Sequence, residues 1–287
     1  MVLIWGYSWI VMKIALRHAH PFDFAAWRVG MGAVLLFLLV KLMGKPLTLP
    51  GYRMAVILGI LQVALFVALS HFALLEAGPG KTSVLIFTMP FWMVVFAHFI
   101  LQERMRAGQW MAVALAFVGL TLIVAPWNLT SLLGSVLAVA GGSVWAISAV
   151  LSKRWPTRAD PLTFTAWQLL VGFFVLLVLA FVTSNEPIHW NAEFIGALAF
   201  STIAATAIGW WLWTYILSNT PAGIAGLNSL GIPVVAVLAS WIQLDERPPP
   251  PEMVGMVLIG CALALLAVSG LRNGRPAPAA PGESPRS

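Results

Sequence analysis

The chain has 287 residues, of which 60% are hydrophobic and 9% are charged, and its formal net charge is +6. Soluble domains carry roughly 25% charged residues, so the composition excludes a soluble globular protein. The single cysteine, Cys261, excludes a disulfide scaffold, and the apolar content excludes an intrinsically disordered chain. The composition therefore predicts a polytopic membrane protein, in which the positive charge reports orientation and not a nucleic acid partner.

Apolar segments of membrane-spanning length follow one another along the whole chain. A helix needs about 20 apolar residues to cross the hydrocarbon core of a bilayer. Cutting the sequence at proline, glycine, asparagine and charge clusters gives ten predicted spans, at residues 2–19, 23–43, 52–75, 80–101, 107–125, 132–152, 161–183, 193–217, 221–243 and 251–270. Residues 271–287 are rich in proline, glycine and alanine, which predicts a disordered tail.

The lysine and arginine residues are unevenly divided between the two sides of these spans. Eleven fall on the side of the N-terminus and five on the other side. By the positive-inside rule, the first side is cytoplasmic, so both termini are expected to face the cytoplasm.

The two halves of the sequence repeat each other. An offset of 140 residues places Trp5 on Trp145, Ser8 on Ser148 and Lys13 on Lys153, and after a three-residue insertion Pro90 falls on Pro233. The repeat unit has five spans, an odd number, so the second copy enters the membrane from the opposite face. The sequence thus predicts an all-α membrane protein of ten transmembrane helices, arranged as two five-helix inverted repeats over residues 1–127 and 131–270.

Several of the repeated motifs resemble the EamA-type branch of the drug/metabolite transporter superfamily. They are Trp5–Trp9 with Lys13, Ala77–Gly80, Pro90 and Leu101–Arg104, together with their copies in the second half. The tryptophan-rich spans look most like the bacterial aromatic amino acid exporters of that superfamily. The resemblance implies a secondary transporter of the bacterial inner membrane that exports amino acids, with aromatic and other apolar ones favoured and broad specificity.

Two prolines lie in the middle of repeat-equivalent spans. Pro90 and Pro233 each remove one backbone hydrogen bond and kink a helix. Because Thr88, Asn228 and Ser229 lie nearby, we interpret the two prolines as hinges and Asn228 as a substrate-binding residue. A kink that serves packing alone is the alternative.

Polar groups within apolar spans are the further candidates for substrate binding. His71 lies in span three with Gln62 and Ser70, and an ionisable group at that depth is expected to face the bundle interior, either in a cavity or as a packed core histidine. Lys13, and more weakly Arg28, could reach a substrate carboxylate, although snorkelling to the interface also explains them.

The fourteen tryptophans fall into two groups. Those near span ends fit an interfacial aromatic belt, whereas the deeper ones either pack between helices or line a pocket that binds apolar side chains. We favour Trp5, Trp9 and Trp145 for the pocket, beside Ser8 and Ser148, because spans one and six are expected near the pseudo-two-fold axis.

No motif supports catalysis or cofactor binding. The Gly78–Thr82 stretch lacks the first glycine of a phosphate loop, and no zinc motif, cysteine pair or nucleophile elbow is present. We expect no enzyme, metal or cofactor. The expected partners are amino acid substrates and membrane lipid, without nucleic acid, and homo-oligomer formation is left open. The alternatives are export of other small metabolites or cationic drugs, a channel, and a membrane-embedded enzyme.

Overall fold

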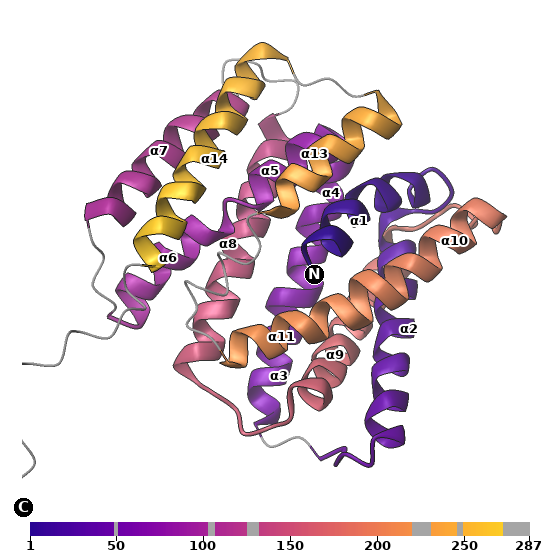
Figure 1. Ribbon diagram of the computed structural model, residues 1–287. Helices are drawn as coiled ribbons and strands as arrows, with labels where there is room; N and C mark the ends of the chain where they lie inside the picture. Colours follow the sequence, from indigo (N-terminus) through magenta and orange to yellow (C-terminus); the bar gives the residue numbers. More distant parts are fainter. Residues whose placement is uncertain (49–50, 103–106, 125–131, 220–230, 246–248, 272–287) are drawn as a thin grey trace, which may run out of the picture.

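The computed structural model describes residues 1–271 except 49–50, 103–106, 125–131, 220–230 and 246–248; some side chains within helices, Pro233 among them, also lie outside the description. The described part is helical, and Figure 1 shows its helices in sequence colours. The first half comprises α1 (Val2–Ala15), α2 (Pro21–Leu42), α3 (Tyr52–Leu58), η1 (Gly59–Leu65), α4 (Phe66–Ala77), α5 (Pro79–Ile86), α6 (Met89–Ile100) and α7 (Ala107–Val124).

The second half repeats this order. It comprises α8 (Leu132–Arg154), α9 (Pro161–Thr183), α10 (Ala192–Phe200), η3 (Ser201–Ile208), α11 (Gly209–Asn219), α13 (Gly231–Leu244) and α14 (Pro250–Leu271). The segments η1 and η3 are π-helical turns inside longer helices and fall at equivalent places of the two halves. Proline occupies the first turn of both α2 and α9, where its missing N–H costs no helical hydrogen bond.

Six helical segments of the described chain are long and apolar enough to cross a membrane: Pro21–Leu42, Tyr52–Ala77, Lys81–Ile100, Leu132–Arg154, Pro161–Thr183 and Ala192–Asn219. Shorter apolar helices cover Val2–Ala15, Trp110–Gly119 and Met253–Ala262. Large apolar side chains such as Leu42 and Phe181 are exposed on the outer surface, as expected for contact with lipid. The protein is a multi-pass membrane protein, and the count of ten spans stays a prediction.

Repeat-equivalent helices pack against each other. The pair α2 and α9 runs antiparallel, because Ser184 after α9 contacts Asp23 near the start of α2, and Thr163 near the start of α9 contacts Pro46 after α2. The pair α7 and α14 lies side by side at one edge of the molecule (Figure 1). Equivalent helices that run in opposite directions are related by a two-fold axis in the membrane plane.

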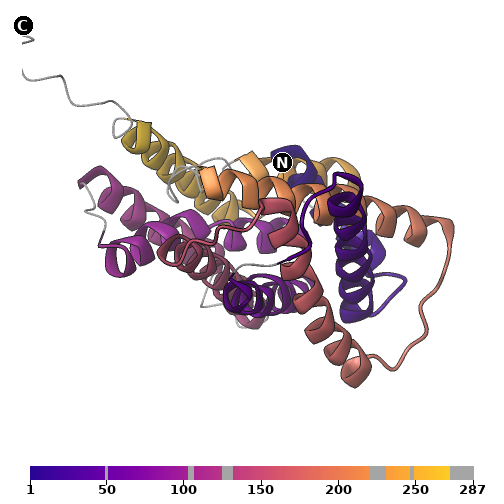
Figure 2. The same cartoon turned by 90° about the horizontal axis from the view of Figure 1, so that it is seen from below.

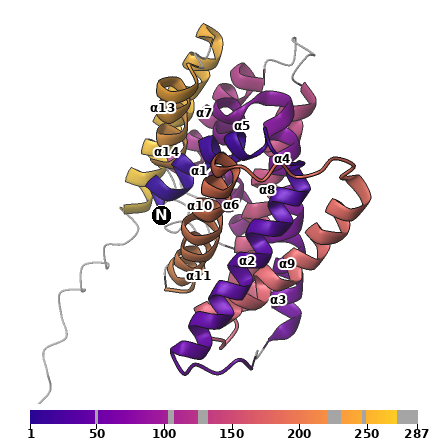
Figure 3. The ribbon, with the colours of Figure 1, turned by 90° about the vertical axis from the view of Figure 1, so that its right-hand side faces the viewer.

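The other contacts between the two halves follow the same pseudo-two-fold symmetry. Helix α1 packs against α10, η3 and α13 of the second half (Figure 3), and α8 packs against η1, α4, α5 and α6 of the first half. Gly32 of α2 faces Thr206 of η3, and its repeat equivalent Gly172 of α9 faces Val63 of η1. In each case a Cβ on the glycine would lie less than 3 Å from the neighbouring side chain, so glycine permits this close approach.

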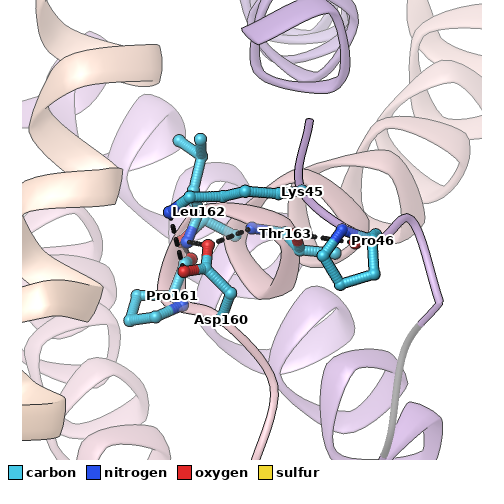
Figure 4. Close-up of polar contacts among 7 residues, drawn as sticks. Lys45, Pro46, Asp160, Pro161, Leu162 and Thr163 are labelled. Atoms are coloured by element: carbon cyan, nitrogen blue, oxygen red, sulfur yellow. Dashed lines mark hydrogen bonds and ion pairs between the residues drawn. The ribbon is translucent and has the colours of Figure 1, made fainter. Parts of the chain in front are cut away.

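Hydrogen bonds join the halves at both ends of the α2–α9 pair. At one end, Lys45 donates to the Asp160 carboxylate at 2.8 Å and the Thr163 hydroxyl donates to the Pro46 carbonyl at 3.2 Å (Figure 4). At the other end, His18 pairs with Glu193 at 2.8 Å. Figure 2 shows the connection from α9 to α10 passing beside the α1–α2 connection, where the His189 N–H donates to the His18 carbonyl.

Candidate functional site

The face of α1 that turns towards the bundle lines a cavity between the two halves. Trp5, Ser8, Trp9 and Met12 lie at i, i+3, i+4 and i+7, so one side of the helix presents all four. The Trp5 indole N–H donates to the carbonyl of Ala205 in η3 at 2.9 Å, which fixes α1 against the second half. The Ser8 hydroxyl donates to the Trp5 carbonyl at 2.7 Å, and its oxygen remains able to accept a hydrogen bond.

Trp145 of α8 is the centre of an aromatic cluster on the opposite wall. Its ring lies edge-on to Trp5 at 5.6 Å between centroids, to Phe66 at 4.6 Å and to Trp210 at 5.1 Å, and it is tilted against Trp213 at 5.4 Å. Such edge-to-face arrangements are the favoured geometry of aromatic pairs. The repeat-equivalent Trp5 and Trp145 therefore meet through their rings, close to the axis that relates the halves.

The polar corner of the cavity consists of Arg28 from α2 and His71 from α4. Both side chains are buried, and both rest against the ring of Phe24, with the Arg28 guanidinium carbon 5.8 Å and the His71 ring 6.1 Å from its centroid. Nδ1 of His71 lies 3.1 Å from the Pro21 carbonyl, which can only accept, so this nitrogen carries a proton. No acidic side chain is among the described residues that line the cavity.

A break between α5 and α6 forms the last wall. Helix α5 ends at Ile86 and α6 begins at Met89, with Pro90 in its first turn. Phe87 and Thr88 form a turn between the two helices, so the helical hydrogen bonds are interrupted just before Pro90, where the sequence predicts a kink. The Ile86 carbonyl would be paired with the N–H of residue 90 in a continuous helix, and proline has none. This carbonyl lies so close to Gly142 of α8 that a Cβ there would approach it to 2.5 Å.

The resulting cavity is narrow, with a volume of about 60 Å³, and the empty space reaches about 570 Å³ only when the open solvent at its mouth is counted. Its lining is aromatic and sulfur-containing around one buried cation and one histidine. The lining residues are Trp5, Ser8, Trp9, Met12, Arg28, Phe66, Ser70, His71, Ile86, Phe87, Met89, Trp145, Ala205 and Trp210.

A second cavity occupies the repeat-equivalent place, towards the Lys45–Asp160 end. Gln168 corresponds to Arg28 by the offset of 140 residues, and Thr214 corresponds to His71 by the offset of 143 residues. Both line this cavity together with Gln62, Ser152 and Trp213. The Gln168 amide donates to Gln62 at 2.7 Å, and the Thr165 and Thr214 hydroxyls lie 2.8 Å apart. Trp213 separates the two cavities, because it also contacts Trp5 and Trp145.

Five of the predicted substrate-binding residues, Trp5, Ser8, Trp9, His71 and Trp145, lie around the first cavity. Their role in binding stays a prediction. Three further predicted residues lie elsewhere: Lys13 is partly exposed on α1, Ser148 is buried in α8 with its hydroxyl bonded to the Val144 carbonyl, and Asn228 lies outside the described residues.

Of the two predicted hinge residues, only Pro90 has a side chain that the structure describes. Pro90 is buried next to the α5–α6 break. Pro233 is the third residue of α13, with its side chain outside the description. Motion at either proline stays a prediction.

The cavity also includes residues that the sequence reasoning did not select. Phe66, Met12 and Phe87 are apolar residues among many others, and the Ala205 carbonyl carries no sequence signal at all. Met12 could have been found, because it continues the helical spacing of Trp5, Ser8 and Trp9. The sequence favours Lys13 over Arg28 as the residue that binds a substrate carboxylate, but it is Arg28 that lies in the cavity lining.

Antiparallel repeats around a buried cavity with polar groups define the class of secondary transporters. The model of the EamA-like transporter family matches the chain twice, over residues 1–125 and 132–268. The chain belongs to the EamA-like transporter family, and its function is small-molecule transport across a membrane.

Individual relatives agree with this assignment. The uncharacterized transporter YoaV of Bacillus subtilis is 28% identical over 270 residues, which cover 92% of each chain. A protein of Escherichia coli named "Probable amino-acid metabolite efflux pump" is 24% identical over 95% of this chain and 93% of its own length. One solved crystal structure shares the fold with a TM-score of 0.72, at 19% identity, over 94% of this chain and 96% of its own.

Proposed function

We propose that the protein exports amino acids across the bacterial inner membrane, with aromatic and other apolar side chains favoured and broad specificity. The observation that carries this proposal is the first cavity, in which aromatic and methionine side chains from both halves surround Arg28. Aromatic walls bind apolar and aromatic side chains by burial and edge-to-face packing, and a buried cation pairs with a carboxylate. The Escherichia coli relative named as an amino-acid metabolite efflux pump supports the same substrate class.

Alternating access is the proposed mechanism. Two cavities lie at repeat-equivalent places on either side of the tryptophans at the centre, so exchange of conformation between the halves would open one cavity while closing the other. By the positive-inside rule, the distribution of lysine and arginine supports a cytoplasmic Lys45–Asp160 end, with the second cavity on the same side as both termini. Substrate would then enter through the second cavity, whose described lining has Lys153 but no carboxylate, and leave from the first.

Export of other small metabolites is the alternative. Export of cationic drugs is disfavoured, because Arg28 would repel a cation and no acidic residue is among the described residues of either cavity lining. A membrane-embedded enzyme would need a cluster of catalytic groups, whereas the first cavity offers one histidine beside one arginine.

Counterflow tests this proposal. Purified protein in proteoliposomes loaded with unlabelled phenylalanine should take up labelled phenylalanine transiently above equilibrium, with saturation. Tryptophan and methionine should compete, and a quaternary ammonium ion should not. Protein-free liposomes are the control for leakage. Uptake that rises linearly without saturation would support a channel, and competition by the quaternary ammonium ion alone would support the drug-export alternative.

A further inference from the structure

Arg28 is a buried cation whose hydrogen bonds are incomplete among the residues that the structure describes. Its side chain extends from α2 into the cavity wall, its Nε lacks a hydrogen-bond partner among the described residues, and only 7% of the residue is exposed. Burying a charge is costly unless an opposite charge or hydrogen bonds compensate it. The contact with the Phe24 ring supplies a modest attraction, which leaves the guanidinium able to bind an anion that enters the cavity.

His71 presents the opposite kind of group next to Arg28. Because Nδ1 donates to the Pro21 carbonyl, the neutral ring has a lone pair on Nε2. Nε2 is buried and has no partner among the described residues. His71 therefore offers a hydrogen-bond acceptor beside a guanidinium donor.

The other half of the molecule shows that the fold does not need these two groups. At the equivalent positions, Gln168 and Thr214 are neutral and have hydrogen-bond partners, Gln62 and the Trp210 carbonyl respectively. The symmetric framework of α2, α9, η1 and η3 thus accepts a satisfied, uncharged arrangement. A cation and an acceptor that lack these hydrogen bonds, at positions where the other half has neutral bonded groups, and that lie in the lining of a cavity, are candidates for binding a ligand.

Resting on the proposed function, we propose that Arg28 and His71 together bind the head group of an α-amino acid. The guanidinium binds the carboxylate, and Nε2 of His71 accepts a hydrogen bond from the ammonium group. An α-amino acid carries these two groups on one carbon atom, which matches a donor and an acceptor that rest against the same Phe24 ring. The side chain of the substrate then lies among Trp5, Trp9 and Trp145. The site requires both head groups and accepts a range of apolar side chains.

Three ligands with the same aromatic ring and two-carbon linker test this inference on the unmodified protein. L-phenylalanine has both head groups, 3-phenylpropionate lacks the ammonium group, and 2-phenylethylamine lacks the carboxylate. Binding to purified protein in detergent is measured by isothermal titration calorimetry, and competition is measured in counterflow. Phenylalanine should bind at least tenfold more tightly than either of the other ligands, with the amine the weakest.

Two substitutions assign the head groups to their residues. Arg28→Gln introduces the residue found at position 168 and should reduce phenylalanine affinity to about that of the amine, while leaving amine binding within about twofold. His71→Phe removes the acceptor and should reduce phenylalanine affinity to about that of 3-phenylpropionate. Arg17→Gln removes an exposed positive charge outside the cavity and is the matched control, with affinities expected to stay within about twofold.

Equal binding of phenylethylamine and phenylalanine would overturn the role of Arg28. Equal binding of 3-phenylpropionate and phenylalanine would overturn the role of His71 and identify the ligand as an organic monocarboxylate. If either variant fails to fold, the ligand series on the unmodified protein still gives the answer. Discrimination in binding without counterflow would uphold the head-group site and overturn the transport proposal. Counterflow without discrimination would do the reverse.

Discussion

The equivalent polar positions of the two halves are used in different ways. In the first half, Arg28 and His71 face an aromatic cavity with side-chain nitrogens that have no partner among the described residues. In the second half, Gln168 and Thr214 occupy the same places with their hydrogen bonds made. Among the described residues, the second cavity also has unpaired donors, the Gln62 amide and the Trp213 indole, and Lys153 lies in its lining. The two repeats thus share one backbone arrangement. The positions at which their side chains differ in charge and hydrogen bonding are the candidates for substrate recognition.

The same contrast applies to the two central tryptophans. Trp5 donates its indole N–H to the Ala205 carbonyl, whereas the equivalent nitrogen of Trp145 is buried without a partner among the described residues. The Trp5 ring thus joins two helices through a hydrogen bond, and the Trp145 ring has a donor that its described neighbours leave unused. Substitutions at these positions separate structural from binding groups, and their expected effects on stability differ in size.

The largest effect is expected at the Gln62–Gln168 pair. Gln168→Leu leaves the buried Gln62 carbonyl oxygen unsatisfied and should lower the free energy of unfolding by about 1–3 kcal/mol. The double substitution with Gln62→Leu should recover most of this loss, because both polar groups are then removed. Unfolding in detergent, followed by tryptophan fluorescence, measures the change. If Gln168→Leu alone left stability unchanged while abolishing counterflow, Gln168 would be a substrate residue and the contrast with Arg28 would fail.

The second prediction concerns the caps of the equivalent helices α9 and α2. The Asp160 carboxylate accepts hydrogen bonds from the Leu162 and Thr163 N–H groups and from Lys45 (Figure 4), while His20, at the equivalent position of α2, makes no side-chain cap. Asp160→Ala should lower the free energy of unfolding by about 1 kcal/mol. His20→Ala is the matched control and should change it by less. An equal loss in both variants would show that capping is not the cause.

The contribution of the Asp160 cap to the stability of the fold should also depend on pH. Partial burial by itself would raise the pKa of this carboxyl, but the hydrogen bonds from Lys45 and the Thr163 backbone, and the Lys45 charge, lower it below its ordinary value of 3.8. A carboxyl with a lowered pKa stabilises the fold fully above the ordinary value and loses its contribution as pH falls through the lowered one. The stability difference between the unmodified protein and Asp160→Ala should therefore be constant above about pH 5. It should shrink on acidification, and a difference that grew would contradict this assignment.

The smallest effect on stability is expected from the two central tryptophans. Both Trp5→Phe and Trp145→Phe shrink a buried ring and cost packing. Trp5→Phe also removes the hydrogen bond to Ala205, so it should lower the free energy of unfolding by about 0.5–1.5 kcal/mol more than Trp145→Phe, which should weaken phenylalanine binding. Each variant is the control for the other. Equal stability losses would mean that both rings are only packing elements.

Much of the architecture could be predicted from the sequence. Hydropathy identified the multi-pass membrane class, and the register of Trp5 with Trp145 and of Pro90 with Pro233 identified the duplication. Five spans in each repeat stay a prediction. The turn before Pro90 lies where the sequence predicts a kink, but the sequence does not reveal that the Ile86 carbonyl packs against Gly142 of another helix. The π-helical turns η1 and η3 share no glycine or proline that would distinguish them from ordinary helix, since η1 begins at Gly59 and the equivalent residue of η3 is Thr202.

The candidate site shows what only the tertiary structure decided. In a soluble protein, the apolar face of a helix identifies its packed side, but in a bilayer the lipid-facing side is equally apolar, so periodicity does not reveal which tryptophans turn inward. The sequence by itself determined the membrane class, the repeats and a set of candidate residues that included Trp5, Trp145 and His71. The packing of α2 against α4 brought Arg28 rather than Lys13 to the cavity, beside a histidine 43 positions away in the sequence. Which of the two residues faces the cavity depends on how each helix is rotated about its axis. This rotation is set by contacts between helices and not by the hydropathy of a single helix.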